Sequence, residues 1–155
     1  KTAELFAAAT KVGAILSNMK NKEKEALEFY GRNLGLTFQI ADDTLDYNSE
    51  LKLFGKKIGQ DFYEGKITLP IILLFQKADS KERETLKEIF LKNERNENDF
   101  KSILSLIKKY EIIKACYQKA QHYINLASNS LSVFKDCEEK NILENLTSFT
   151  LSRDF

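Results

Sequence analysis

Residues 38–47 read Phe-Gln-Ile-Ala-Asp-Asp-Thr-Leu-Asp-Tyr and place three carboxylates inside an otherwise apolar run. If the run is helical, Asp42 and Asp46 lie on one face, with Asp43 beside them and Gln39 one turn earlier. Like charges at this spacing destabilise a helix, and a buried carboxylate without a partner costs more still. The pattern therefore predicts acids that face a cation. Magnesium is the natural candidate, because one or two carboxylates and the oxygens of a substrate phosphate commonly hold it.

A glycine-rich stretch follows at residues 55–70. It contains half of the chain's six glycines, its only proline and the lysines Lys56, Lys57 and Lys66. Such a loop lets backbone approach a ligand, and its ammonium groups can reach phosphate oxygens. The acidic helix and the lysine-bearing loop together predict a diphosphate that is held through metal on one side and ammonium on the other.

Apolar residues recur at spacings of three and four along most of the chain, and a period-two strand pattern with turn signals is absent from the sequence. This predicts an all-α fold and one helical domain over residues 1–155. The predicted helices cover about residues 2–18, 22–47, 69–78, 80–92, 100–109, 111–134 and 138–152.

Several residues have predicted roles in these helices. Ser80 and Asp99 are the expected N-caps of the fourth and fifth helices. Gly31 and Gly35 are tolerable in the second helix if they permit close contact with another helix. The apolar residues of the first helix are expected to be buried, and the stripe between residues 113 and 134 is expected to form core or a subunit contact.

The composition excludes several classes of function. The formal net charge is +1, with 24 basic and 23 acidic residues interspersed, so neither a nucleic-acid footprint nor a polybasic membrane patch is expected. The sequence contains no apolar stretch of the roughly 18 residues that a membrane span needs, and it does not open with a signal sequence. Cys116, Cys137 and the single His122 do not form a redox or zinc motif, which favours a reduced, cytoplasmic compartment.

Less specific interpretations stand beside the metal site. Asp42, Asp43 and Asp46 could form an acidic solvated helix face, although the apolar residues between them leave little room for one. A calcium loop lacks its Asp-x-Asp-x-Asp-Gly spacing. The lysines of residues 55–70 could simply be exposed, and Cys116, Cys137 and His122 are expected to be surface or packing residues.

Four ordered segments resemble motifs of the trans-type polyprenyl diphosphate synthases. Residues 38–46 resemble the family's second aspartate-rich motif, and Lys1-Thr2-Ala3 resembles its Lys-Thr motif. Residues 55–61 resemble its Gly-Lys-x-x-Gly-x-Asp loop, and residues 64–70 the segment after it. An Asp-Asp-x-x-Asp pattern alone is weak, but four elements in order are specific.

The resemblance implies the helical isoprenoid-synthase fold, usually as a homodimer, and magnesium-dependent prenyl transfer. An allylic diphosphate would lose pyrophosphate, and the double bond of isopentenyl diphosphate would attack the resulting carbocation. Carried over by position, the magnesium ligands are Asp42, Asp43 and Asp46. The diphosphate contacts are Lys1, Lys66 and either Lys56 or Lys57, with Lys56 favoured by the Gly-Lys alignment. The other substrate-binding residues are Thr2, Phe38 and Gln39.

The sequence also departs from the family. It does not contain the first aspartate-rich motif or the nearby basic residues that bind isopentenyl diphosphate. We therefore expect a C-terminal portion of a synthase, inactive alone and with exposed apolar faces. The alternatives are a non-catalytic helical interaction or regulatory subunit derived from such an enzyme, and a terpene cyclase, which the loop at residues 55–61 disfavours.

Overall fold

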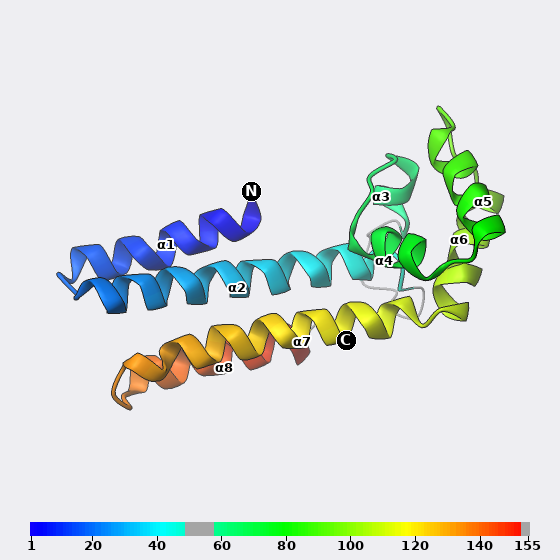
Figure 1. Ribbon diagram of the computed structural model, residues 1–155. Helices are drawn as coiled ribbons and strands as arrows, with labels where there is room; N and C mark the ends of the chain where they lie inside the picture. The colour runs from blue at the N-terminus through cyan, green and yellow to red at the C-terminus, as the bar shows by residue number, and fades with distance from the viewer. Residues whose placement is uncertain (49–57, 153–155) are drawn as a thin grey trace. The chain divides into compact units, whose positions relative to one another are not determined.

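The computed structural model describes residues 1–48 and 58–152 of the chain, and every regular element within these ranges is a helix (Figure 1). The predicted all-α fold is confirmed. The described helices include none that is long and apolar enough to cross a membrane. The elements are α1 (Thr2–Leu16), α2 (Asn21–Leu45), α3 (Gln60–Tyr63), α4 (Leu69–Lys77), α5 (Ser80–Leu91), α6 (Glu97–Lys109), α7 (Ile112–Ser130), the 3-10 turn η1 (Leu131–Val133) and α8 (Glu138–Ser152).

The described residues fall into two compact units. One contains residues 1–41 and the chain from residue 117 onward, and the other contains residues 42–116. Helices α2 and α7 contribute to both units. The single domain predicted for residues 1–155 stays a prediction.

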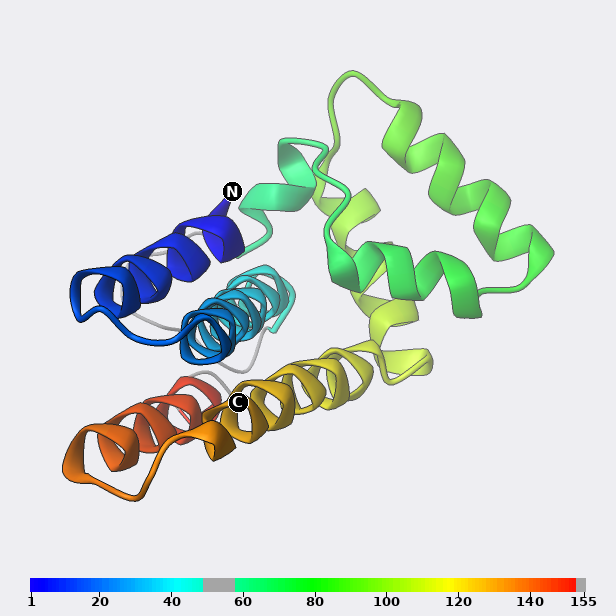
Figure 2. The ribbon, with the colours of Figure 1, turned by 60° about the vertical axis from the view of Figure 1, so that its left-hand side comes forward.

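In the first unit, α1 and α2 lie side by side (Figures 1 and 2) and approach closely at two glycines. A Cβ atom on Gly31 would lie 2.3 Å from Thr10 Oγ1 and 2.5 Å from the carbonyl oxygen of Phe6, and one on Gly35 would lie 2.7 Å from Ala3 Cα. The predicted close helix contact is confirmed. Thr10 Oγ1 strengthens it by donating to the Leu27 carbonyl oxygen at 2.6 Å.

The core of the first unit joins α2 to α7 and α8. The stripe predicted on α7 is buried at Ala120, Ile124 and Ala127. The Tyr30 hydroxyl donates to the Leu143 carbonyl oxygen of α8 at 2.8 Å. In the second unit, at the N-terminus of α7, Ile112 is fully buried instead of the predicted Ile113, which is half-buried. The periodicity was right to within one residue.

The apolar face of α1 is a correction to the sequence analysis. Its buried residues are Ala7 and Ala14. Leu5 and Leu16 are 71% and 77% exposed, and Val12 and Ile15 are also exposed. Apolar periodicity predicts a face that favours cover, but it does not identify the segment that covers it. Helix α8 shows the same pattern at Ile142, Leu146 and Phe149.

In the second unit, two predicted N-caps are wrong by one and three residues. Asp79 caps α5 and forms a capping box with Glu82, so Ser80 is the first helical residue. Asn96 caps α6, and Asp99 is the acid that completes its capping box. A capping box needs an acid three residues after the cap, and this condition selects Asp79 and Asn96 over the later candidates.

An aromatic cluster holds the glycine-rich stretch against α5 and α6. Phe62 of the one-turn helix α3 is fully buried, and its ring centroid lies 5.7 Å from Phe90 and 5.2 Å from Phe100. Helix α4 begins at Leu69 with Pro70 in its first turn, as predicted. The sequence analysis missed α3, because four residues are too few to show a helical period.

Candidate functional site

The acidic motif lies at the C-terminal end of α2. Asp42 is exposed and Asp43 half-exposed, both in the last turn, and Asp46 follows the final helical residue, Leu45. The negative end of a helix dipole disfavours acids, and the described last turn of α2 contains no Lys or Arg side chain. This end of α2 therefore favours a bound cation.

Asp46 is turned toward the segment that begins α3. Its Oδ1 accepts the backbone N–H of Gln60 at 3.1 Å, and its Oδ2 accepts that of Asp61 at 2.8 Å. The backbone N–H of Gly59 also donates to the Asp46 carbonyl oxygen at 3.0 Å. Asp46 is only 3% exposed. These three hydrogen bonds fasten the end of α2 to the start of α3.

Gly59 makes this connection possible. Its φ of 84° lies in the left-handed region, which side chains other than glycine rarely adopt. A Cβ atom there would also lie 2.7 Å from the ring of Phe100. The glycine thus lets the chain turn into α3 directly against the aromatic cluster.

Lys66 follows α3 and is paired with two carboxylates. Its Nζ lies 2.9 Å from Asp61 Oδ1 and 2.7 Å from Glu64 Oε2, and the hydrogen bonds to Glu64 and Asp61 raise the pKa of Lys66 above its ordinary value. The side chain is 55% exposed. Lys66 therefore carries a positive charge at neutral pH and can exchange a carboxylate for a phosphate oxygen.

The negative charges of three carboxylates act on the buried side chain of Tyr47. Burial raises the pKa of Tyr47 above its ordinary value, and the negative charges of Asp46, Asp61 and Asp43 raise it further. The charges of the motif and of the α3 segment therefore act on one buried side chain. This negative field favours cations.

Two of the predicted substrate-binding residues of the first unit, Thr2 and Gln39, are brought into contact. Thr2 Oγ1 donates to Gln39 Oε1 at 2.8 Å. The ring of Phe38 is 36% exposed and its centroid lies 5.8 Å from that of Phe6. Lys1 is exposed at the start of the chain. Lys56 and its alternative Lys57 lie outside the described residues.

A magnesium ion needs oxygen ligands, which carboxylates and phosphate oxygens supply. Among residues 1–48 and 58–152, no group of three or more Asp, Glu, His or Cys side chains is arranged to hold an ion. Asp42 and Asp43 nevertheless fit magnesium, because this ion keeps several waters and is held by one or two carboxylates together with substrate phosphate oxygens. The sequence analysis named Asp61 only as part of a motif.

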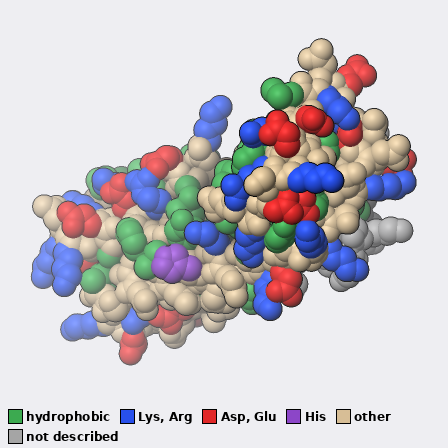
Figure 3. Space-filling view, turned by 45° about the vertical axis from the view of Figure 1, so that its right-hand side comes forward, with side chains coloured by type: hydrophobic (Ala, Val, Ile, Leu, Met, Phe, Trp, Pro, Cys, Tyr) green, Lys and Arg blue, Asp and Glu red, His purple; other side chains and the backbone are tan. Residues whose placement is uncertain are grey.

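The cysteines and the histidine have no place in this arrangement. Cys116 is buried, and burial raises the pKa of its thiol to about 11, so it is an unreactive packing residue. Cys137 and His122 are exposed. On the face shown in Figure 3, the acidic and basic side chains are interspersed, as the near-neutral net charge and the interspersed charges of the sequence predict. The expectation of packing and surface roles for these three residues agrees with their burial.

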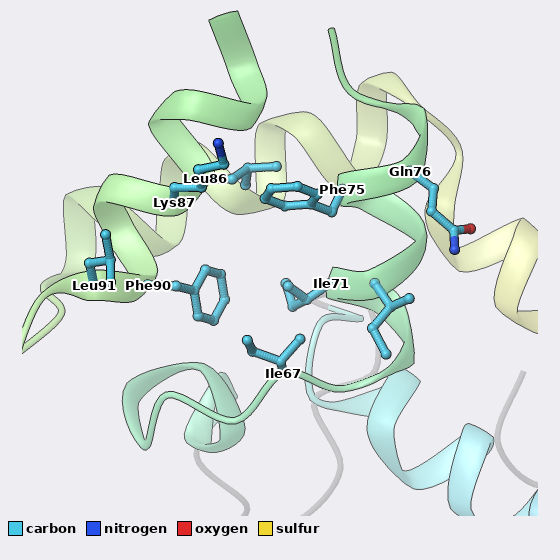
Figure 4. A pocket seen from close by; sticks show the side chains of 9 residues that line it. Ile67, Ile71, Phe75, Gln76, Leu86, Lys87, Phe90 and Leu91 are labelled. Atoms are coloured by element: carbon cyan, nitrogen blue, oxygen red, sulfur yellow. The ribbon is translucent and has the colours of Figure 1, made fainter. Parts of the chain in front are cut away.

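A pocket lies between α4 and α5 (Figure 4). This pocket of about 630 Å³ is almost wholly apolar, and Ile67, Ile71, Phe75, Leu86 and Phe90 line it. The sequence analysis did not predict it, since the residues come from two helices and a loop. None of its lining residues belongs to the acidic motif.

The model of the family described as polyprenyl synthetase matches residues 1–107. A short chain isoprenyl diphosphate synthase of Methanothermobacter thermautotrophicus is 35% identical over 154 residues, which cover 99% of this chain and 47% of the relative. The chain spans about half the length of the curated relatives it matches.

Solved structures give the same picture. A decaprenyl diphosphate synthase from Rhodobacter capsulatus matches with a TM-score of 0.91 and 34% identity, covering 100% of this chain and 48% of that one. A polyprenyl synthase from Caulobacter crescentus, complexed with calcium and isoprenyl diphosphate, matches with a TM-score of 0.89 and 39% identity, covering 100% and 47%. The chain therefore has the all-α fold of about half of such a synthase.

Proposed function

The chain belongs to the polyprenyl synthetase family, and from this premise we propose that it is part of a magnesium-dependent prenyltransferase. The proposed reaction joins an allylic diphosphate head to tail to isopentenyl diphosphate and gives a longer polyprenyl diphosphate. The observation that carries the proposal is the end of α2, where Asp42 and Asp43 stand next to a segment fastened by Asp46 that presents Lys66.

Asp42 and Asp43 would hold the metal, which supplies a positive charge to the leaving diphosphate. Lys66, and by resemblance Lys1 and Lys56, would bind the same group through ammonium. Negative charge grows on the diphosphate as its bond to carbon breaks. Lysines fixed at that position therefore stabilise the transition state more than the bound substrate.

The other predicted residues would orient the allylic substrate. The Thr2 hydroxyl and the Gln39 amide already bond to each other at 2.8 Å, so they can offer a paired polar surface. Phe38 presents an exposed ring that could contact hydrocarbon. We also propose a homodimer, which the exposed apolar faces of α1 and α8 favour, and a cytoplasmic location, which two free cysteines favour.

Asp42→Ala tests the proposal in a complete polypeptide that contains residues 1–155. We expect kcat for prenyl transfer to fall by about a hundredfold or more, since a metal contributes several kcal/mol to stabilising transition-state charge and each 1.36 kcal/mol is tenfold in rate. The measurement is incorporation of labelled isopentenyl diphosphate at several magnesium concentrations.

Glu25→Ala is the matched control, because it removes an exposed acid from the same helix α2. Its rate should equal that of the unmodified enzyme. An Asp42→Ala enzyme with undiminished rate and unchanged magnesium dependence would refute the metal role. It would leave the non-catalytic helical subunit as the better proposal.

A further inference from the structure

We propose that Asp46, the third acid of the motif, is a positioning residue. It fixes the position of Lys66 through Asp61 and does not bind the metal itself. The inference rests on the proposed function, because it concerns how the diphosphate site is assembled. Three links carry it: Asp46 to the backbone of α3, α3 to the Asp61 carboxylate, and that carboxylate to Lys66.

The first link occupies both oxygens of Asp46. They accept the N–H groups of Gln60 and Asp61 at 3.1 and 2.8 Å. Hydrogen bonds to a charged acceptor are stronger than neutral ones, and backbone N–H donors offset the cost of burying a carboxylate. Asp46 is 3% exposed, whereas a magnesium ion that keeps several waters needs ligands that reach solvent. Asp42, which is exposed, meets that need.

The second and third links run through Asp61. Its backbone N–H is held by Asp46, and its carbonyl oxygen accepts the backbone N–H of Lys66 at 2.9 Å. Its Oδ1 accepts the Lys66 ammonium, also at 2.9 Å. Gly65, with φ of 76°, gives the left-handed turn that brings Lys66 back toward Asp61. Hydrogen bonds to Asp61 therefore hold both the backbone and the side chain of Lys66.

This chain of contacts connects the two sides of the proposed site. The acids that would hold metal lie on α2, and Lys66 lies beyond residues 49–57 in the sequence. Asp46 joins them directly by hydrogen bonds across that interval. Because reacting groups must be placed to within about 1 Å, loosening this joint should impair the site even with Asp42 and Asp43 intact.

Hydrogen exchange of single amides, measured by NMR on the 155-residue chain, tests the proposal. In Asp46→Asn the side chain keeps one acceptor oxygen and loses the other. We expect the amides of Gln60 and Asp61 to exchange at least tenfold faster than in the unmodified chain. The affinity for Mn²⁺, measured from the paramagnetic relaxation of water protons, should change by less than twofold.

Asp42→Asn is the matched control for the metal. It should weaken Mn²⁺ binding at least tenfold and leave the Gln60 and Asp61 amides unchanged. Unchanged exchange in Asp46→Asn would overturn the proposal whatever the metal does. A loss of Mn²⁺ affinity in Asp46→Asn equal to that in Asp42→Asn would overturn it as well. Mn²⁺ binding that survives in Asp42→Asn would instead count against the proposed function.

Asp61→Asn keeps the test decisive if Asp46→Asn does not fold. It leaves the Asp61 backbone N–H in place, so the Gln60 and Asp61 amides should exchange as before. The side-chain resonances of Lys66 should shift, because the ammonium loses one of its two carboxylates. Lys66 resonances that do not move in Asp61→Asn would contradict the third link.

Discussion

Glu82 is a single carboxylate that joins two helices of the second unit. It accepts the backbone N–H of Asp79 at 3.2 Å, which completes the capping box of α5. It also binds Lys109 Nζ at 2.6 Å and the Tyr110 hydroxyl, both from the C-terminal end of α6. The hydrogen bonds from Lys109 and Tyr110 lower the pKa of Glu82 from 4.5 to about 2.

This lowered pKa gives a pH dependence of stability. An acid whose pKa is lower in the folded state stabilises fully above its unfolded value, here 4.5, and loses that contribution as pH falls toward about 2. We expect the urea concentration at the unfolding midpoint, measured by circular dichroism, to decrease as the pH is lowered from 5 to 2. In Glu82→Gln this decrease should be smaller. Glu97→Gln, which removes a surface pair with Lys101, should flatten it less. Identical curves for the two variants would contradict this role of Glu82.

At the scale of single residues, the sequence predicts which residue types form the candidate site, but it does not predict which residues they bond to. Type and spacing predict the acids and lysines of the candidate site, and the structure pairs Lys66 with Asp61 and Glu64. The partners of Asp46 lie 14 and 15 residues away, so no local pattern indicates them. The true cap Asp79 could have been found, because Glu82 follows it at the capping-box distance.

At the scale of elements, the contact between α1 and α2 depends on Gly31. In Gly31→Ala the new methyl group would meet Thr10 Oγ1 and the backbone of Phe6, and backbone cannot yield as a flexible side chain does. We expect a loss of about 1–3 kcal/mol in the free energy of unfolding, typical of overpacking. Thermal or urea unfolding of the chain measures it.

Gly13→Ala is the matched control within the same pair of helices. No described atom lies within 4 Å of a Cβ placed on Gly13, so only helix propensity changes. The expected result is a gain of up to about 1 kcal/mol. Equal effects of the two substitutions would show that packing between α1 and α2 does not decide the outcome at Gly31.

Periodicity predicted most helices to within a few residues, because their apolar positions repeat over several turns. It placed the last helix at residues 138–152, as in α8. It failed for α3, which depends on Gly59, Asp46 and Phe100 rather than on its own four residues. Short elements held by distant residues cannot be read from local sequence.

At the scale of the whole molecule, the chain leaves apolar surface uncovered on α1 and α8, and it spans about half the length of its relatives. We expect the isolated chain to self-associate as its concentration rises, because apolar patches of this kind favour contact. Sedimentation velocity measures the association. Leu16→Lys should weaken it without lowering the melting temperature, since Leu16 is 77% exposed.

Ser17→Lys is the control, because it adds the same charge at the neighbouring exposed position and removes no apolar surface. Association that both variants weaken equally would point to charge instead of apolar contact. Exposed apolar faces are expected from the resemblance to a C-terminal portion of a synthase, although the periodicity of α1 by itself predicts burial. Apolar spacing alone does not identify which residues of such a face are covered, and the structure shows Leu5 and Leu16 exposed.

The close approach of α1 and α2 at Gly31 and Gly35 also limits how this protein can change over time. At each of these two positions hydrogen is the largest substituent that fits, so nearly every change to another residue should be eliminated by selection. In a saturation library selected for soluble expression, variants at Gly31 and Gly35 should be depleted, whereas variants at Gly13 should be retained. Substitutions that this protein tolerates should therefore lie away from the contact between α1 and α2 at Gly31 and Gly35.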